Sequence, residues 1–247
     1  MNIDIEDTKF LLNKNILITG ASKGIGKCLA LNFSKYGANT ILLSKDEKLL
    51  DQVYDEIKRK YKTNPMIITC DLNNLDENYC QEITNSIQKT YGNLDALINN
   101  AAIVEKLSTI ENYDLKTWEK VIKVNLTSSF LLSRFLLPIL KISEIPRIIF
   151  TSSGVAKKGS SFWGAYSISK GGIKILAEIL KDEVETTSKL KIFNFDPKVT
   201  RTDMRAHAFP AEDPLQIKKP DELIKYYLWM LSEKSSGSEN LYIEFKD

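Results

Sequence analysis

The sequence is poor in histidine and cysteine and carries almost no excess charge. Its one histidine, His207, cannot build most zinc sites, and any Ser-His-Asp or Cys-His nucleophile would have to use it. The three cysteines, Cys28, Cys70 and Cys80, form no CxxC pair and no even-numbered framework, which favours a reducing compartment without disulfides. Lys and Arg number 34 against 32 Asp and Glu, so there is no broad basic field for nucleic acid. We expect neither a bound metal nor a nucleic-acid partner.

Long hydrophobic runs are also missing. The most apolar stretch, Phe130 to Leu140, is short for a membrane span and contains Arg134 and Pro138, so we predict a buried helix there. The N-terminal segment MNIDIEDTKF lacks the uninterrupted apolar core of a signal peptide. These absences predict a cytoplasmic protein that has no membrane partner.

The composition is that of an ordinary globular protein, with 43% apolar and 27% charged residues. A chain of 247 residues is near the upper limit for one hydrophobic core, and no linker rich in Pro, Gly or Ser divides it. We therefore predict a single domain over residues 1–247. Its cofactor half would cover about residues 14–110, and its catalytic and substrate half about residues 111–247.

Short apolar runs rich in β-branched residues are predicted to be strands buried on both faces. They are Asn15 to Thr19, Asn39 to Ser44, Pro65 to Cys70, Leu94 to Asn99, Arg147 to Ser152 and Lys191 to Phe195. Longer segments with helical spacing lie between them, for example Lys48 to Tyr61 and Glu77 to Tyr91. Because strands alternate with helices, the sequence predicts an α/β fold with a doubly wound parallel sheet.

Two C-terminal segments add to this fold. Leu241 to Phe245 could supply a last edge strand. Phe209 to Pro220 contains three prolines, so we predict a loop or broken helix that acts as a mobile lid.

A glycine-rich segment, TGASKGIG, follows the first predicted strand and precedes an apolar helix. Gly20, Gly24 and Gly26 would let the backbone turn sharply and approach a pyrophosphate, while the helix N-terminus offers free N–H groups. Three glycines could simply make a turn, and their GxxxGxG spacing differs from GxGxxG. The strand before and the helix after favour a dinucleotide cradle.

A second constellation includes Tyr166 and Lys170, which share one face if YSISK is helical. The spacing alone is weak, because two other Tyr–Lys pairs in the chain have it. Ser153, thirteen residues earlier at the end of a predicted strand, and Asn125, in a predicted apolar helix, strengthen the pattern. A buried Asn is costly unless hydrogen-bonded, although a purely structural Asn stays open.

Taken together, these residues resemble the short-chain dehydrogenase/reductase family over essentially the whole chain. The matching segments are TGASKGIG at 19–26, Asp71-Leu72, NNAA at 99–102, Asn125, Ser153 and YSISK at 166–170. The C-terminal third, at 200–214 and 226–231, resembles the uncharacterised YciK-type bacterial oxidoreductases. The resemblance implies a Rossmann fold, hydride transfer with a nicotinamide cofactor, and pairing of the Asn125 and Tyr166 helices in a homodimer or homotetramer.

The resemblance also implies a role for each catalytic residue. Tyr166 would exchange a proton with a carbonyl or alcohol. The Lys170 cation, with an oxidised nicotinamide when present, should lower its pKa from about 10 toward the working range. Ser153 would bind the substrate by donating a hydrogen bond to the carbonyl oxygen. Asn125 would hold a water that relays protons to Lys170.

Cofactor-binding positions are carried over in the same way. They are Gly20, Ser22, Lys23, Gly24, Ile25, Gly26, Ser44, Lys45, Asp71, Leu72, Asn99, Ala101, Tyr166, Lys170, Pro197, Thr200 and Thr202. Three departures bear on them: Ala102 and Lys198 stand where the family usually has Gly, and the C-terminus lacks the Asp-Gly-Gly ending of many relatives.

The end of the second predicted strand bears on the cofactor. NAD enzymes commonly place an acid there for the ribose 2′-hydroxyl, whereas a 2′-phosphate calls for cations and hydroxyls. This strand ends in Ser44 and Lys45, and Lys23 could approach the same phosphate. We therefore predict NADP. NAD is the alternative, because Asp46 follows directly and both lysines could be merely solvated.

The expected substrate is a small carbonyl or alcohol compound. Met204, Phe209, Trp163 and His207 could line its pocket, although core packing or solvation would explain them equally well. Two alternatives stay open: a 3-oxoacyl carrier-protein reductase, and a non-catalytic nucleotide-binding sensor. Lys198 keeps the sensor alternative open, and the complete Asn/Ser/Tyr/Lys set favours an enzyme.

Overall fold

A computed structural model of the protein describes residues 10–246, so nearly all of the segment tested for a signal peptide lies outside it. Within these residues, a seven-stranded sheet has the order β3-β2-β1-β4-β5-β6-β7, and every pair is parallel. Its strands are β1 (Asn15–Thr19), β2 (Asn39–Ser44), β3 (Met66–Thr69), β4 (Ala96–Asn99), β5 (Arg147–Thr151), β6 (Lys191–Asp196) and β7 (Tyr242–Glu244). The predicted doubly wound α/β fold is confirmed.

One prediction about the strands was wrong. β1 and β2 have their predicted bounds, and the last strand, β7, forms one edge of the sheet as predicted. β3, however, is only partly buried: Met66, Ile67 and Ile68 are half-buried, although they pack against the core clusters on the two faces, and Thr69 is exposed. It forms the opposite edge of the described sheet, where β2 is its sole neighbour, so its side chains are less enclosed.

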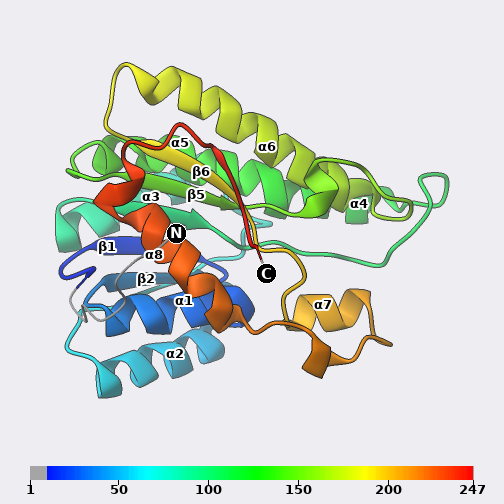
Figure 1. The fold of residues 1–247 in the computed structure, drawn as a ribbon, viewed down its shortest axis with the longest axis horizontal. Coiled ribbons are helices and arrows are strands. Elements are labelled where there is room, and N and C mark those ends of the chain that lie inside the picture. The colour runs from blue at the N-terminus through cyan, green and yellow to red at the C-terminus, as the bar shows by residue number, and fades with distance from the viewer. Residues whose placement is uncertain (1–9, 247) are drawn as a thin grey trace.

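Helices cover both faces of the sheet (Figure 1). They are α1 (Gly24–Lys35), α2 (Glu47–Lys60), α3 (Glu77–Tyr91), α4 (Leu115–Ile122), α5 (Ser128–Leu140), α6 (Gly164–Glu185), α7 (Asp203–Ala208) and α8 (Ile224–Leu231). An aspartate N-caps each of α2, α3 and α4 by accepting a backbone N–H three residues on, at 2.8–3.1 Å; these are Asp46, Asp76 and Asp114. The predicted apolar helix at 130–140 lies within α5.

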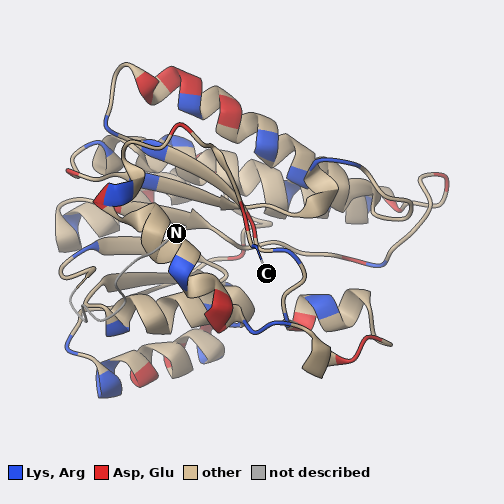
Figure 2. Ribbon diagram, in the orientation of Figure 1, with Lys and Arg blue, Asp and Glu red and all other residues tan. Residues whose placement is uncertain are grey.

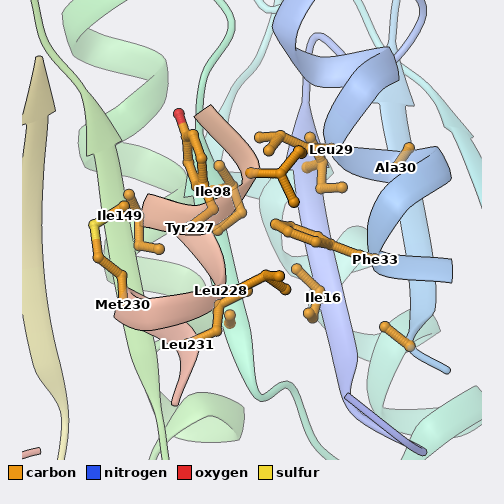
Figure 3. Close-up of a cluster of buried hydrophobic side chains, with 14 of the residues drawn as sticks. Ile16, Leu29, Ala30, Phe33, Ile98, Ile149, Tyr227, Leu228, Met230 and Leu231 are labelled. Atoms are coloured by element: carbon orange, nitrogen blue, oxygen red, sulfur yellow. The ribbon is translucent and has the colours of Figure 1, made fainter. Parts of the chain in front are cut away.

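The core is divided between the two faces by strand alternation. Ile16 and Ile18 of β1 pack with α1, α2 and α8, whereas Leu17 between them packs with α3, α5 and α6. Figure 3 shows the first of these clusters, in which Tyr227 and Leu228 of α8 and Phe33 of α1 meet over the strands. The rings of Phe33 and Tyr227 lie edge to face, with their centroids 6.4 Å apart.

The segment from Phe209 to Pro220 is largely irregular, as predicted, with one short 3₁₀ turn at Pro214–Gln216. Together with α7 it projects beside the carboxyl ends of the strands (Figure 1). Its movement as a lid stays a prediction.

Figure 2 shows cationic and anionic residues interspersed along the outer helices in this view. None of the helices in the described part of the chain is both long and apolar enough to span a membrane.

The order of the strands predicts where a ligand-binding crevice lies. From β1 the chain moves outward to β2 and β3, and from β4 it moves the other way to β5, β6 and β7. In open parallel sheets, ligands bind beyond the carboxyl ends of the strands at this reversal of strand order. The loops that follow β1 and β4 should therefore border the site.

Candidate active site

A cavity of about 930 Å³ lies beyond the carboxyl ends of the strands. Its lining joins the glycine-rich loop after β1 with the catalytic candidates on α6. The predicted site residues that line it are Gly20, Ser22, Lys23, Gly24, Ile25, Ser44, Lys45, Asp71, Leu72, Ala101, Ser153, Tyr166, Lys170, Pro197, Thr200 and Thr202. Three other predicted site residues, Gly26, Asn99 and Asn125, are buried and do not line the cavity.

The glycine-rich loop has little room for side chains. Gly20 has φ +69°, and a Cβ there would lie 3.1 Å from the Cα of Ala101. A Cβ on Gly26 would lie 2.1 Å from the carbonyl oxygen of Gly20. Gly26 thus lets α1 pack closely against the loop and does not face the cavity. Among the described residues, no side chain caps α1 and its first turn holds no acid, so its N-terminal N–H groups suit an anion.

Two residues within the motifs were missed by the sequence analysis. The hydroxyl oxygen of Thr19 accepts hydrogen bonds from the backbone N–H groups of Asn100 and Ala101, each at 2.9 Å. The Asn100 amide donates back to the carbonyl of Thr19 at 3.0 Å, which fixes the loop after β4 against the loop after β1. Asn99 is buried beneath them, and its amide donates to the Ser133 hydroxyl at 3.3 Å. The quoted segments contain both missed residues, but only the contacts show what they do.

Hydroxyls and a lysine gather where β2 ends. The hydroxyls of Ser22 and Ser44 lie 2.9 Å apart, and Lys45 is exposed beside them. Asp46, the acid that favoured NAD, is outside the lining and accepts the N–H of Leu49 at 3.1 Å. Its carboxylate is therefore committed to the N-terminus of α2.

On the opposite side, α7 lies close to the glycine-rich loop. A Cβ on Gly24 would lie 3.4 Å from the methyl carbon of Thr202, which N-caps α7. The Lys23 ammonium is 3.8 Å from the Asp203 carboxylate. Both side chains are well exposed, so this pair contributes little and leaves Lys23 available to a phosphate.

The catalytic candidates converge where β5 ends. Lys170 is buried in α6 and donates to the carbonyl oxygen of Thr151 at 2.7 Å. Its ammonium lies 5.8 Å from the ring centre of Tyr166, one helical turn earlier. Ser153 follows β5 by two residues and forms a hydrogen bond with Tyr166. The structure thus brings these three predicted residues together.

Burial raises the pKa of Tyr166 to about 12, the negative charge of Asp196 adds to the rise, and the hydrogen bond to Ser153 only partly opposes them. The pKa of Lys170 is lowered to about 8 by burial, although Asp196 opposes this change. The predicted lowering of the pKa of Tyr166 by Lys170 and an oxidised nicotinamide stays a prediction.

Asn125 lies in a π-helical turn, Lys123–Thr127, between α4 and α5. Its side-chain oxygen accepts the N–H of Ile103 at 2.8 Å, and its amide donates to the Ile103 carbonyl at 3.0 Å and to the Ser169 hydroxyl at 3.1 Å. Asn125 thereby ties the loop after β4 to α6. Such π turns often occur at functional sites. Its predicted water relay stays a prediction.

Lys198 adopts the left-handed conformation that glycine would take without strain, with φ +55°. Its N–H donates to Asp196 at 2.8 Å, and its ammonium pairs with Asp196 at 3.1 Å and with Glu244 of β7 at 2.9 Å. Lys157 also pairs with Glu244. The chain thus makes a glycine-like turn despite the substitution. Asp196 was missed, although an acid directly after a buried apolar run is a visible signal.

Comparisons with known proteins agree with this arrangement. The chain is 36% identical over 226 residues to the uncharacterised oxidoreductase YciK of Escherichia coli strain K12, covering 91% of this chain and 89% of that protein. Short chain dehydrogenases from Shigella flexneri 2a, complexed with NADP, and from Escherichia coli CFT073, complexed with NADPH, have TM-scores of 0.91 and 0.90. Each is 34% identical and covers 96% of this chain and 98% of its own.

The match extends to the family as a whole. Residues 14–213 match the short chain dehydrogenase family, which spans both the glycine-rich loop and the Tyr166–Lys170 helix. The resemblance inferred from the motifs, including that to YciK, is confirmed. The chain therefore belongs to the short chain dehydrogenase family.

Proposed function

We propose that the protein is an NADP-dependent oxidoreductase that interconverts a carbonyl and an alcohol. The observation that carries this proposal is one cavity with a phosphate cradle at one end and Tyr166, Lys170 and Ser153 at the other. A protein that only sensed the nucleotide would need the cradle but not the proton-transfer set.

The cavity residues fit a bound NADPH, which would supply the hydride. Ser153 would donate a hydrogen bond to the carbonyl oxygen, and Tyr166 would give that oxygen its proton. The carbonyl carbon gains the hydride, which leaves an alcohol, NADP⁺ and a phenolate on Tyr166. Lys170, held by the carbonyl of Thr151, stabilises that phenolate while it is charged.

Because the pKa of Tyr166 is about 12, its hydroxyl is protonated at neutral pH and can act as the acid in reduction. Burial opposes the phenolate in both directions of the reaction, so its stabilisation by Lys170 matters for each of them. A cytoplasmic location is part of the proposal, since Cys28, Cys70 and Cys80 are all free thiols.

The direct test is a screen for NADPH oxidation by the purified protein with aldehydes, ketones and 3-oxoacyl thioesters. Turnover of simple carbonyls supports the proposal. A strong preference for 3-oxoacyl carrier-protein thioesters would favour that reductase instead. Tight NADPH binding with no turnover across the panel would favour the sensor.

We expect NADPH to bind at least tenfold more tightly than NADH, which corresponds to about 1.4 kcal/mol. The physical reason is the pair of hydroxyls beside Lys45, with Asp46 committed to capping α2. Lys45→Ala should remove most of the difference, as measured by fluorescence titration. Lys48→Ala, which changes an exposed lysine outside the lining, serves as the control. Equal affinities in the unmodified protein would contradict the choice of NADP.

We also propose a homodimer or homotetramer. Ile168, Ile175 and Ile179 lie on one side of α6 and are 50–51% exposed, which is a costly arrangement for a monomer. Light scattering at micromolar concentration should detect an oligomer, and Ile175→Glu should dissociate it. Leu12→Glu, which changes an exposed leucine before β1, should have no such effect. A monomeric unmodified protein would refute the proposal.

A further inference from the structure

Two aromatic side chains form a wall beside Tyr166. Trp163, at the start of α6, has its ring centre 5.5 Å from that of Tyr166 and 5.7 Å from that of Phe209. Both Trp163 and Phe209 line the cavity, although they come from different parts of the chain. We call these two residues the aromatic wall. A substrate whose carbonyl reaches the Tyr166 hydroxyl would have its next atoms beside this wall.

The wall is held in place from outside. The guanidinium carbon of Arg205 lies 3.7 Å from the ring centre of Phe209. Arg205 is itself fixed by two hydrogen bonds to Glu212, at 2.6 and 2.8 Å. These two hydrogen bonds hold the guanidinium of Arg205 over the ring of Phe209, in the loop after α7. The carboxylate of Glu212 also neutralises the charge of Arg205.

Two further cations of the lining, Lys120 and Lys198, also have carboxylate partners, whereas Lys170 donates to the carbonyl oxygen of Thr151. Lys120 pairs with Glu105 at 2.7 Å, and Lys198 pairs with Asp196 at 3.1 Å. An anionic group on a substrate would have to compete with these carboxylates and would meet their negative charge. Apolar side chains such as Val155 and Met204 complete the lining.

We propose that the enzyme acts on neutral carbonyl compounds that carry an aromatic ring, with that ring packed against Trp163. This inference rests on the proposed function and adds the substrate class. Aromatic pairs in edge or offset geometry gain attraction beyond their buried area, which a saturated ring of the same size does not. The paired cations make a neutral ring the better fit.

The test compares phenylacetone with cyclohexylacetone, because one methylene separates each ring from the carbonyl and the two carbonyls are similarly reactive. We expect kcat/KM for the phenyl ketone to be about three- to tenfold higher. A para-carboxylate on the phenyl ring should lower kcat/KM. Trp163→Leu should bring the phenyl-to-cyclohexyl ratio close to one. Phe162→Leu, which changes an exposed neighbour outside the lining, should preserve the ratio.

Equal rates for the two ketones, or a ratio that Trp163→Leu leaves intact, would overturn the inference while the proposed function stands. If Trp163→Leu fails to fold, Phe209→Leu tests the same wall from its more exposed side. If no carbonyl in the screen is reduced, the proposed function itself fails. In that case the affinities of the two ketones decide the inference. They are measured by the quenching of Trp163 fluorescence, with Trp163→Leu as the reference that lacks this signal. Equal affinities for the two ketones overturn the inference.

Discussion

Tyr166→Phe is expected to lower kcat for carbonyl reduction by about 10²- to 10⁴-fold. The substitution removes the transferable proton and little volume, so NADPH affinity should change little. Steady-state rates with a substrate found in the screen, together with a fluorescence titration of NADPH, would measure both effects. Tyr54→Phe is a matched control, because Tyr54 lies in α2, packs against the core and is outside the cavity lining.

The unmodified enzyme should also show a characteristic pH profile. The pKa of Lys170 is about 8, so its ammonium loses its proton as pH rises through that value and can no longer stabilise a phenolate on Tyr166. Reduction should therefore slow above about pH 8, while Tyr166 itself stays protonated.

For the substitution described first, near-normal turnover by Tyr166→Phe would refute the catalytic assignment.

Arg147→Ala is expected to lower the free energy of unfolding by about 4 kcal/mol, and Tm by about 10 °C. Arg147 starts β5 and is 1% exposed. Its guanidinium donates to the carbonyls of Met230, Ser232 and Pro146 at 2.9–3.0 Å and to the Ser236 hydroxyl at 2.7 Å. It thereby holds the C-terminal end of α8 against the sheet.

Burial opposes this contribution but does not cancel it. Burial lowers the pKa of Arg147 to about 10, which corresponds to a cost of about 3 kcal/mol. Hydrogen bonds from a charged donor contribute about 1.5–3 kcal/mol each, so four of them outweigh that cost. Arg134→Ala, at an exposed pair with Glu77, should change stability by no more than about 1 kcal/mol. Equal melting temperatures for the two variants would contradict this account.

The sequence predicted most of the fold because its signals are local. Apolar β-branched runs mark each strand, and the glycine-rich loop and the Tyr166–Lys170 spacing each lie within one short segment. The burial of β3 was mispredicted, since an apolar run does not reveal whether a strand lies at the edge of a sheet. Edge position depends on strand order, which is a property of the whole chain.

Features that depend on distant contacts could not be read from the sequence. Thr19 and Asn100 lie 81 residues apart, and their hydrogen bonds exist only because β1 and β4 are neighbours in the sheet. The raised pKa of Tyr166 in the protein without cofactor also depends on distant contacts, because its burial and the approach of Asp196 arise from packing between β6 and α6. The capping role of Asp46, in contrast, is local and follows from its place before α2.

The ion pairs around Lys198 form a neutral quartet, in which the ammonium groups of Lys157 and Lys198 face the carboxylates of Asp196 and Glu244. One member, Glu244, belongs to the edge strand β7. Loss of its carboxylate would leave a surplus positive charge beside the cavity, which Lys198 lines. The edge strand therefore balances the charge at the cleft, and a change in β7 would alter the electrostatic potential there with the catalytic residues untouched.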